Sequence, residues 1–264
     1  MNTQIITLAA GLFIAASAFT SLVGPTENNK PIETNNTKLA EPGFAVVELF
    51  TSEGCSSCPP ADELVAKVQQ ENLAKPVYIL AFHVDYWDFQ GWRDVFSKSE
   101  FTRRQYQYSA WLRTESVYTP QILVNGKRQF VGSEESSLRN AISQSLSSPV
   151  AGRLTIETTR NNKGISIRYQ ASSVKKNAVL QLALVQKIAK TSVKKGENEG
   201  RELVHVQIVR SLQSQSTNDS GSGEVELKLP EKTQPGNWEI IAFLQNKNNG
   251  EILAAAKTSL KETI

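Results

Sequence analysis

The spacing of hydrophobic residues along the chain changes character near residue 150. In the first part, continuous apolar runs at 44–50 and 77–84 are typical of buried strands. Between these runs, apolar residues after residue 60 recur every three or four positions, which predicts a helix with one buried face. This alternation of strands and helices predicts a partly parallel α/β sheet over residues 43–149.

Beyond residue 150 the hydrophobic pattern takes a period of two. Apolar and mostly polar residues alternate in a series of short segments, as at Leu180, Leu182 and Leu184. Turn-forming stretches such as 161–164, with the sequence NNKG, separate these segments. Short strands at such spacing predict an all-β, sandwich-like domain over residues 150–264.

The N-terminus differs from both parts. Residues 5–19 are apolar or small, and the small residues at 16–18 form a candidate cleavage site, so we expect a signal peptide over 1–22. The polar stretch 23–42 is expected to be a flexible linker. These features predict an exported protein, periplasmic or secreted. No Lys or Arg precedes the apolar run, so membrane anchoring by an uncleaved segment remains the alternative.

Composition narrows the possible functions. The 29 basic and 26 acidic residues nearly cancel and form no concentrated basic stripe, which argues against nucleic acid as a partner. The sequence shows no Ser-His-Asp arrangement, no glycine-rich phosphate loop and no paired-carboxylate motif. We therefore expect no cofactor.

The only two cysteines, Cys55 and Cys58, flank two serines at the junction between a predicted strand and a predicted helix. Free amides and the dipole at a helix start stabilise a thiolate. Cys55 is then the expected attacking sulfur and Cys58 the resolving one. The alternatives are half of a metal site or an inert disulfide, although closing so short a loop adds little stability.

Three sequence blocks carry a resemblance to known proteins: FTSEGCSSCPPAD at 50–62, HVDYWD at 83–88 and YTPQ at 118–121. Their order resembles the thioredoxin-like fold over about 44–146. Together the blocks resemble an exported bacterial family, domain of unknown function 1223, which combines a thioredoxin-like domain with a C-terminal β-rich part. The resemblance implies an α/β thioredoxin-like domain over 43–149, followed by the sandwich-like domain.

The same resemblance implies further site residues. It implies a cis peptide bond before Pro120, which would face the cysteines and, with Thr119, hold the backbone of a substrate polypeptide. An aromatic-rich insert at 85–118 holds three of the four tryptophans. We consider two interpretations of this insert: a recognition surface, with Trp87 contacting substrate, or a helical sub-core of its own.

Charged residues close to the cysteines are candidate accessory groups. Glu53 would disfavour a thiolate at Cys55. His83 ends the second strand and could tune a thiolate, or could complete a copper or zinc site with Cys55 and Cys58. Asp85 could accept a proton near the cysteines or cap the turn that follows the strand.

Other polar residues have a more ordinary interpretation. Glu48 lies in a buried run, either as a neutral proton relay or, as we favour, at a partly exposed strand edge. Asp62 is expected to be an ordinary acid of the first helical turn. His205 alternates with Val204 and Val206 and is expected to face solvent. Arg103 and Arg104 are expected on a solvated helix face.

The predicted function is an exported thiol–disulfide oxidoreductase-like protein that acts on protein or small-molecule thiols and disulfides. One alternative is a metallochaperone that uses Cys55, Cys58 and His83. The other is a non-enzymatic binding module.

Overall fold

A computed structural model describes residues 43–150, 152–161, 164–172, 177–218, 220–230 and 235–260. The predicted signal peptide and linker, residues 1–42, lie outside the described residues. The elements are β1 (Ala45–Thr51), α1 (Pro59–Glu71), β2 (Val77–His83), α2 (Ser99–Leu112), β3 (Gln121–Val124), β4 (Arg128–Val131), α3 (Glu135–Ser147), β5 (Arg153–Asn161), β6 (Gly164–Ser172), β7 (Ala178–Ser192), β8 (Glu202–Ser216), β9 (Ser222–Leu227), the 3-10 turn η1 (Pro235–Asn237), β10 (Trp238–Asn246) and β11 (Ile252–Ser259).

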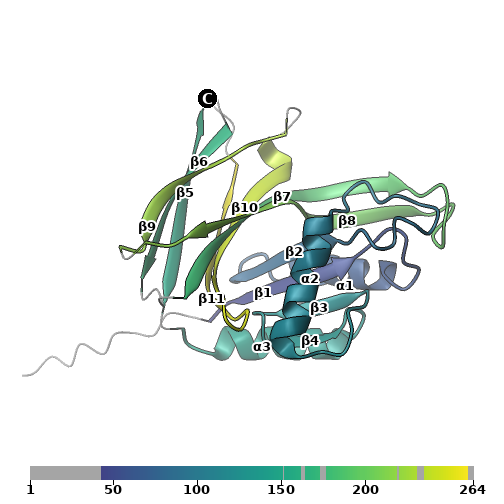
Figure 1. Ribbon diagram of the computed structural model, residues 1–264, viewed down its shortest axis with the longest axis horizontal. Coiled ribbons are helices and arrows are strands. Elements are labelled where there is room, and N and C mark those ends of the chain that lie inside the picture. The colour runs from purple at the N-terminus through teal and green to yellow at the C-terminus, as the bar shows by residue number, and fades with distance from the viewer. Residues whose placement is uncertain are drawn as a thin grey trace, which may run out of the picture. The chain divides into compact units, whose positions relative to one another are not determined.

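An eight-stranded mixed sheet with the order β11-β10-β7-β8-β2-β1-β3-β4 forms the centre of the molecule (Figure 1). β1 pairs in parallel with β2 and antiparallel with β3. The predicted mixed α/β sheet of the first part is therefore confirmed, and its element order is thioredoxin-like. No helix within the described residues is long and apolar enough to cross a membrane.

The β-rich second part does not form two sheets of its own. β5, β6 and β9 form a separate three-stranded sheet, and their apolar faces pack against β7, β10 and β11 in one core. The two sheets thus pack face to face, but not as the separate all-β domain expected over 150–264. The second layer of the sandwich, however, is one end of the eight-stranded sheet, because β8 lies beside β2 with Ala81 opposite Ile208.

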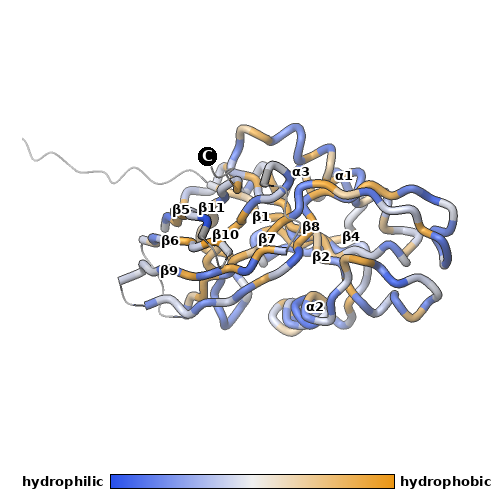
Figure 2. Tube along the Cα trace, turned by 90° about the horizontal axis from the view of Figure 1, so that it is seen from above, coloured by the Kyte–Doolittle hydropathy of each residue, from blue (hydrophilic) through white to orange (hydrophobic). Residues whose placement is uncertain are grey.

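Two further cores cover the two faces of the thioredoxin-like part. On one face, α1 and α3 bury residues such as Val65 and Ile142 against β1, β2 and β3. On the other face, Phe101 and Tyr108 of α2 pack with side chains of β1, β2, β7 and β10. Hydrophobic residues accordingly follow the central strands (Figure 2). The core around Phe101 and Tyr108 contains residues from both parts of the chain.

The insert 85–118 does not form the separate sub-core considered for it. Its C-terminal portion forms α2, and Phe101 and Tyr108 are fully buried in the core that α2 shares with β1, β2, β7 and β10. Phe89 is 90% exposed and Val95 is 62% exposed, so apolar side chains also reach the surface.

A buried ion pair connects three elements of the fold. Arg104 of α2 donates from Nε and Nη2 to the Glu48 carboxylate of β1, at 2.6 and 3.0 Å. Tyr108 donates to the same carboxylate, and Gln245 of β10 accepts from Arg104 Nη1 at 3.1 Å. Burial opposes the Arg104 charge, but Glu48 outweighs it and raises the pKa of the guanidinium. The expectations of a solvated Arg104 and a partly exposed Glu48 were wrong.

Removing one member of this buried pair leaves the other charge without compensation. We expect Arg104→Met to lower the free energy of unfolding by about 3–5 kcal/mol. The exposed pair Lys67–Glu135 is the control, and Lys67→Met should cost about 1 kcal/mol or less. Urea denaturation of both variants measures the difference, and equal losses would contradict the structural role of Arg104.

Candidate redox site

Cys55 and Cys58 form a disulfide at the junction of β1 and α1, with their Cα atoms 5.4 Å apart. Cys58 is the N-cap residue of α1, and Pro59 and Pro60 begin the helix, as predicted. Because proline lacks an amide hydrogen, its place in the first turn removes no helical hydrogen bond. The carbonyl of Cys58 accepts from the amides of Ala61 and Asp62 at 2.9 and 3.1 Å.

The peptide bond between Thr119 and Pro120 is cis, so this prediction is confirmed. A Cβ atom placed on Gly132 would lie 2.9 Å from Pro120 Cβ and 3.0 Å from Ala61 Cβ. Only glycine at position 132 therefore lets this proline pack so closely on the first turn of α1.

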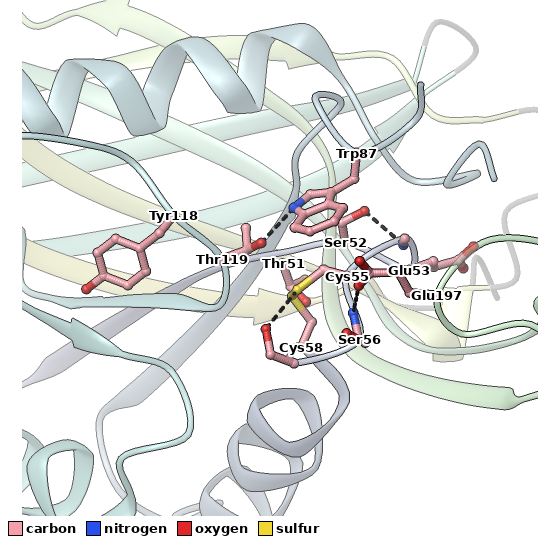
Figure 3. The surroundings of a disulfide bond; sticks show 12 residues. Thr51, Ser52, Glu53, Cys55, Ser56, Cys58, Trp87, Tyr118, Thr119 and Glu197 are labelled. Atoms are coloured by element: carbon pink, nitrogen blue, oxygen red, sulfur yellow. Dashed lines mark hydrogen bonds between the residues drawn. A yellow bond between two sulfur atoms is a disulfide. The ribbon is translucent and has the colours of Figure 1, made fainter. Parts of the chain in front are cut away.

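Trp87 connects the insert to the same loop. Its indole Nε1 donates to Thr119 Oγ1 at 2.7 Å, and Figure 3 shows both residues beside the disulfide. A Cβ atom on Gly54 would lie 3.1 Å from Trp87 Cβ, so the base of the Trp87 side chain packs closely against the residue before Cys55. Trp87 thus positions the loop of Thr119, one of the substrate-binding residues that the sequence predicts.

Both cysteines are fully buried, whereas Ser56 and Ser57 between them are exposed. The Sγ atom of Cys55 lies 3.3 Å from Ser57 Oγ. A thiol reagent therefore reaches the disulfide only after a local movement of the surrounding loops.

The connection between β7 and β8 forms part of that cover. Asn198 is buried there and donates from Nδ2 to the carbonyls of Glu53 and Cys55, both at 2.9 Å. Glu197 accepts from the Ser56 amide at 2.9 Å, and hydrogen bonds from Ser56 lower the pKa of this carboxyl (Figure 3). Sequence reasoning did not identify either residue, because a polar turn between two strands carries no signal of such a contact.

Next to the cysteines lies a cluster of buried ionisable side chains, which we call the acid–histidine cluster. Its members are Glu53, Asp62, His83, Asp94 and His205. They come from the loop after β1, from α1, from β2, from the insert and from β8. Sequence reasoning placed only Glu53 and His83 near the cysteines and missed Asp94.

Asp94 organises one side of the acid–histidine cluster. Its Oδ2 atom lies 2.6 Å from His83 Nδ1 and accepts from the Glu53 amide at 2.9 Å. Its Oδ1 atom accepts from the Phe96 amide. Burial alone would raise the pKa of the Asp94 carboxyl, but His83 and these hydrogen bonds outweigh it, and the pKa is lowered.

His205 occupies the centre of the acid–histidine cluster, with 1% of its side chain exposed. Its Nε2 lies 3.4 Å from Glu53 Oε1 and its Nδ1 lies 4.0 Å from Asp62 Oδ2. The rings of His205 and His83 meet edge to face at 4.8 Å. The expectation of a solvated His205 was wrong, because this end of β8 packs its second face against the first part of the chain.

Asp62 is not the ordinary first-turn acid that the sequence predicts. It is buried, and its Oδ2 accepts from Thr51 Oγ1 at 3.2 Å. Burial raises the pKa of its carboxyl to about 7, although His205 and Thr51 partly oppose the shift. Asp62 is therefore divided between its neutral and charged forms near neutral pH.

Among the accessory candidates, Asp85 lies outside the acid–histidine cluster. Asp85 accepts from Thr102 Oγ1 at 2.5 Å, which holds the start of the insert against the first turn of α2. Glu53 accepts from Trp92 Nε1 at 2.6 Å. His83 faces Asp94, and within the described residues no group of three or more His, Cys, Asp or Glu is arranged to hold a metal ion.

Comparisons with known proteins identify one family and two similar solved structures. Residues 46–245 match the family described as "Protein of unknown function (DUF1223)". The crystal structure of protein AGR_C_4864 from Agrobacterium tumefaciens is similar, with 26% sequence identity, a TM-score of 0.65, and coverage of 85% of this chain and 97% of that chain.

A second solved structure, HBP35 of Porphyromonas gingivalis, gives a TM-score of 0.62 over 85% of this chain and 80% of that chain. Its 16% sequence identity shows a shared fold only. No curated protein matches the sequence.

The raised pKa of Asp62 makes folding stability depend on pH. Between about pH 4 and 7, the Asp62 carboxyl keeps its proton in the folded state. In the unfolded state, where its pKa is 3.8, the same carboxyl is ionised. This contribution to stability is therefore lost as the pH rises through about 7. The free energy of unfolding of Asp62→Asn, compared with that of wild type, should therefore increase by up to about 3 kcal/mol between pH 5 and pH 8.

Urea denaturation at the two pH values measures this gain. Glu63→Gln, at the exposed neighbouring position, is the control and should show no such trend. A difference between Asp62→Asn and wild type that does not change with pH would contradict the buried, neutral carboxyl.

Asn198 should control access to the disulfide, because its side chain holds the turn that contains Cys55. Asn198→Ala removes two buried hydrogen bonds worth together about 2 kcal/mol, so we expect reduction by dithiothreitol to accelerate about tenfold or more. Asn248→Ala, in the exposed turn after β10, should leave the rate unchanged. Equal rates for both variants would show that the connection between β7 and β8 does not limit access.

Proposed function

Because the chain belongs to the DUF1223 family, whose description assigns no reaction, the site itself must indicate the chemistry, and we propose an exported thiol–disulfide oxidoreductase-like protein. The observation that carries this proposal is the Cys55–Cys58 disulfide at the start of α1, in a thioredoxin-like domain with a cis bond before Pro120.

The proposed reaction is a two-electron exchange between two dithiol–disulfide pairs. In the reducing direction, the Cys55 thiolate attacks a disulfide of the partner and releases one partner thiolate. The Cys58 thiolate then attacks Cys55 in the mixed disulfide and releases the second. The partner gains two electrons, and the Cys55–Cys58 disulfide forms. The oxidising direction reverses these steps.

The surroundings of the cysteines suit such an exchange. The dipole of α1, which begins directly after Cys58, favours a thiolate in the cysteine turn, and Thr119, which precedes the cis bond, offers its backbone to an extended polypeptide. The expected partners are protein or small-molecule thiols and disulfides. The predicted signal peptide would direct the protein to an oxidising compartment, periplasmic or extracellular, where disulfides persist.

The burial of both sulfurs favours a second candidate function. In a non-enzymatic binding module, the disulfide would only hold the turn that Asn198 and Trp87 cover. The exposed Phe89 would then belong to the binding surface. This candidate predicts that replacing both cysteines by serine spares the partner interaction.

Equilibration with glutathione separates the two candidates. We expect the wild-type protein to move between zero and two alkylatable thiols as the ratio of reduced to oxidised glutathione changes. Cys58→Ser should accumulate a mixed disulfide with glutathione on Cys55, detected by mass spectrometry. Cys55→Ser should form it at least tenfold more slowly and lose insulin-reducing activity. An unchanged redox state in every buffer, with insulin reduction unaffected by Cys55→Ser, would refute the exchange reaction.

A further inference from the structure

The connection between β7 and β8, residues 193–201, is a closed turn that we call the hairpin tip. The Val193 amide donates to the Arg201 carbonyl at 3.0 Å, and the Gly200 amide donates to the Val193 carbonyl at 3.0 Å. Arg201 also donates from Nη1 to Asn198 Oδ1 at 3.0 Å. Because this bond occupies the side-chain oxygen of Asn198, its Nδ2 group is left to donate outside the tip.

The hairpin tip binds backbone groups of the cysteine turn. Asn198 Nδ2 donates to the carbonyls of Glu53 and Cys55, both at 2.9 Å. Glu197 accepts from the Ser56 amide at 2.9 Å, as Figure 3 shows. Backbone groups point where the conformation of the turn places them, and the disulfide constrains this conformation. The strength of the three hydrogen bonds therefore depends on the conformation that the disulfide imposes.

Within the described residues, few other contacts hold the hairpin tip in place. Of residues 194–201, only Asn198 is buried. Gly196 lies against the insert, since a Cβ atom there would be 3.4 Å from Gln90 O and from Trp92 Cβ. A segment with few buried apolar contacts opens locally at a low cost in free energy. The tip can therefore leave the cysteine turn while β7 and β8 stay paired.

Reduction brings a second negative charge to the turn that Glu197 contacts. Hydrogen bonds from Ser56 lower the pKa of the Glu197 carboxyl, which is therefore ionised at neutral pH. Cys55 directly precedes Ser56, and in the proposed reaction it carries a thiolate. Like charges on neighbouring groups repel, which favours an open tip by about fivefold even at an exposed site. The disulfide carries no charge, so this repulsion is specific to the reduced protein.

We propose that the hairpin tip is a redox-sensitive latch, which binds the cysteine turn when the Cys55–Cys58 disulfide is formed and releases it when the disulfide is reduced. The proposal rests on the proposed thiol–disulfide exchange, which supplies the electrons. Two partner thiols give two electrons and two protons: the S–S bond between the cysteines breaks, a bond between the two partner sulfurs forms, and both cysteines become thiols. The Cys55 thiol then loses its proton to solvent and becomes the thiolate that repels Glu197.

The latch also gives the exchange a preferred direction. Contacts that are made only with the disulfide form stabilise that form, and tip binding and reduction change each other's equilibrium by the same factor. The latch therefore favours the oxidised protein, so the reduced protein donates electrons to its partner more readily than it would without the tip. In the reduced protein, the open tip leaves the cysteines accessible for this reaction.

Trypsin cleavage of the wild-type protein tests the latch. Lys194 and Lys195 are exposed in the hairpin tip, and Lys247, exposed in the turn after β10, is the internal control. We expect cleavage in the tip to be about tenfold faster in protein reduced with a phosphine than in oxidised protein, which corresponds to the loss of about one hydrogen bond. Cleavage after Lys247 should be unchanged. Equal rates of cleavage in the tip in the two redox states would overturn the proposal.

Three variants separate the charge from the hydrogen bonds. Glu197→Gln keeps an acceptor for the Ser56 amide but removes the charge, so its reduced form should be cleaved about fivefold more slowly than reduced wild type. Asn198→Ala removes the hydrogen bonds to the two carbonyls and should be cleaved rapidly in both redox states. Glu199→Gln, at an exposed acid of the same tip, is the matched control and should behave as wild type. If Glu197→Gln and Glu199→Gln behave alike, release of the tip by the Glu197 charge is refuted.

Equilibration with glutathione measures the reverse effect, that of the tip on reduction. For Asn198→Ala the equilibrium should move towards the dithiol, by up to the factor that separates the two cleavage rates of wild type. An equilibrium identical to that of wild type would overturn the preferred direction. If glutathione never changes the number of alkylatable thiols, while reduction by the phosphine still accelerates cleavage in the tip, the proposed function is refuted and the latch stands.

Discussion

The pairing of β8 with β2 determines how the two parts of the chain cooperate. With Ile208 beside Ala81, the long β7–β8 hairpin extends from the sandwich-like core, along the thioredoxin-like sheet, to the cysteine turn. Its strands are 15 residues each, well beyond the typical length of about 5–6 residues. This length brings Asn198 to the Cys55 carbonyl, and His205 to Glu53 and Asp62. The C-terminal part is therefore a structural component of the site.

Burial sets the chemistry of that site. Removing water from Asp62, His205 and Glu53 makes each of their charges costly unless another charge or a hydrogen bond compensates it. The two buried polar clusters of the protein differ in how completely their charges are compensated by partners. Glu48 is compensated by the Arg104 guanidinium and the Tyr108 hydroxyl, which suits a structural role. The acid–histidine cluster leaves several polar atoms uncompensated, which suits groups that change their protonation.

The sequence predicts the parts of the structure that depend on local patterns. Continuous apolar runs identified β1 and β2, and the Cys-x-x-Cys and Thr-Pro motifs located the disulfide and the cis bond. It did not predict which sheet the later strands join, because a period of two shows only that one face of a strand is apolar. His205 shows the consequence: a polar position on β8 was taken as solvent-facing, whereas α1 and the cysteine turn cover it. Arg104 was misplaced for the same reason, since its partner lies 56 residues away in sequence.

Sharing one sheet between the two halves also limits how the molecule can be divided. A fragment that ends near residue 149 would retain both cysteines but would expose the β2 edge that β8 covers. Unpaired backbone groups along such an edge are a template for pairing with another chain. A shortened protein would thus be prone to self-association, and a smaller working version requires a new edge strand in place of β8.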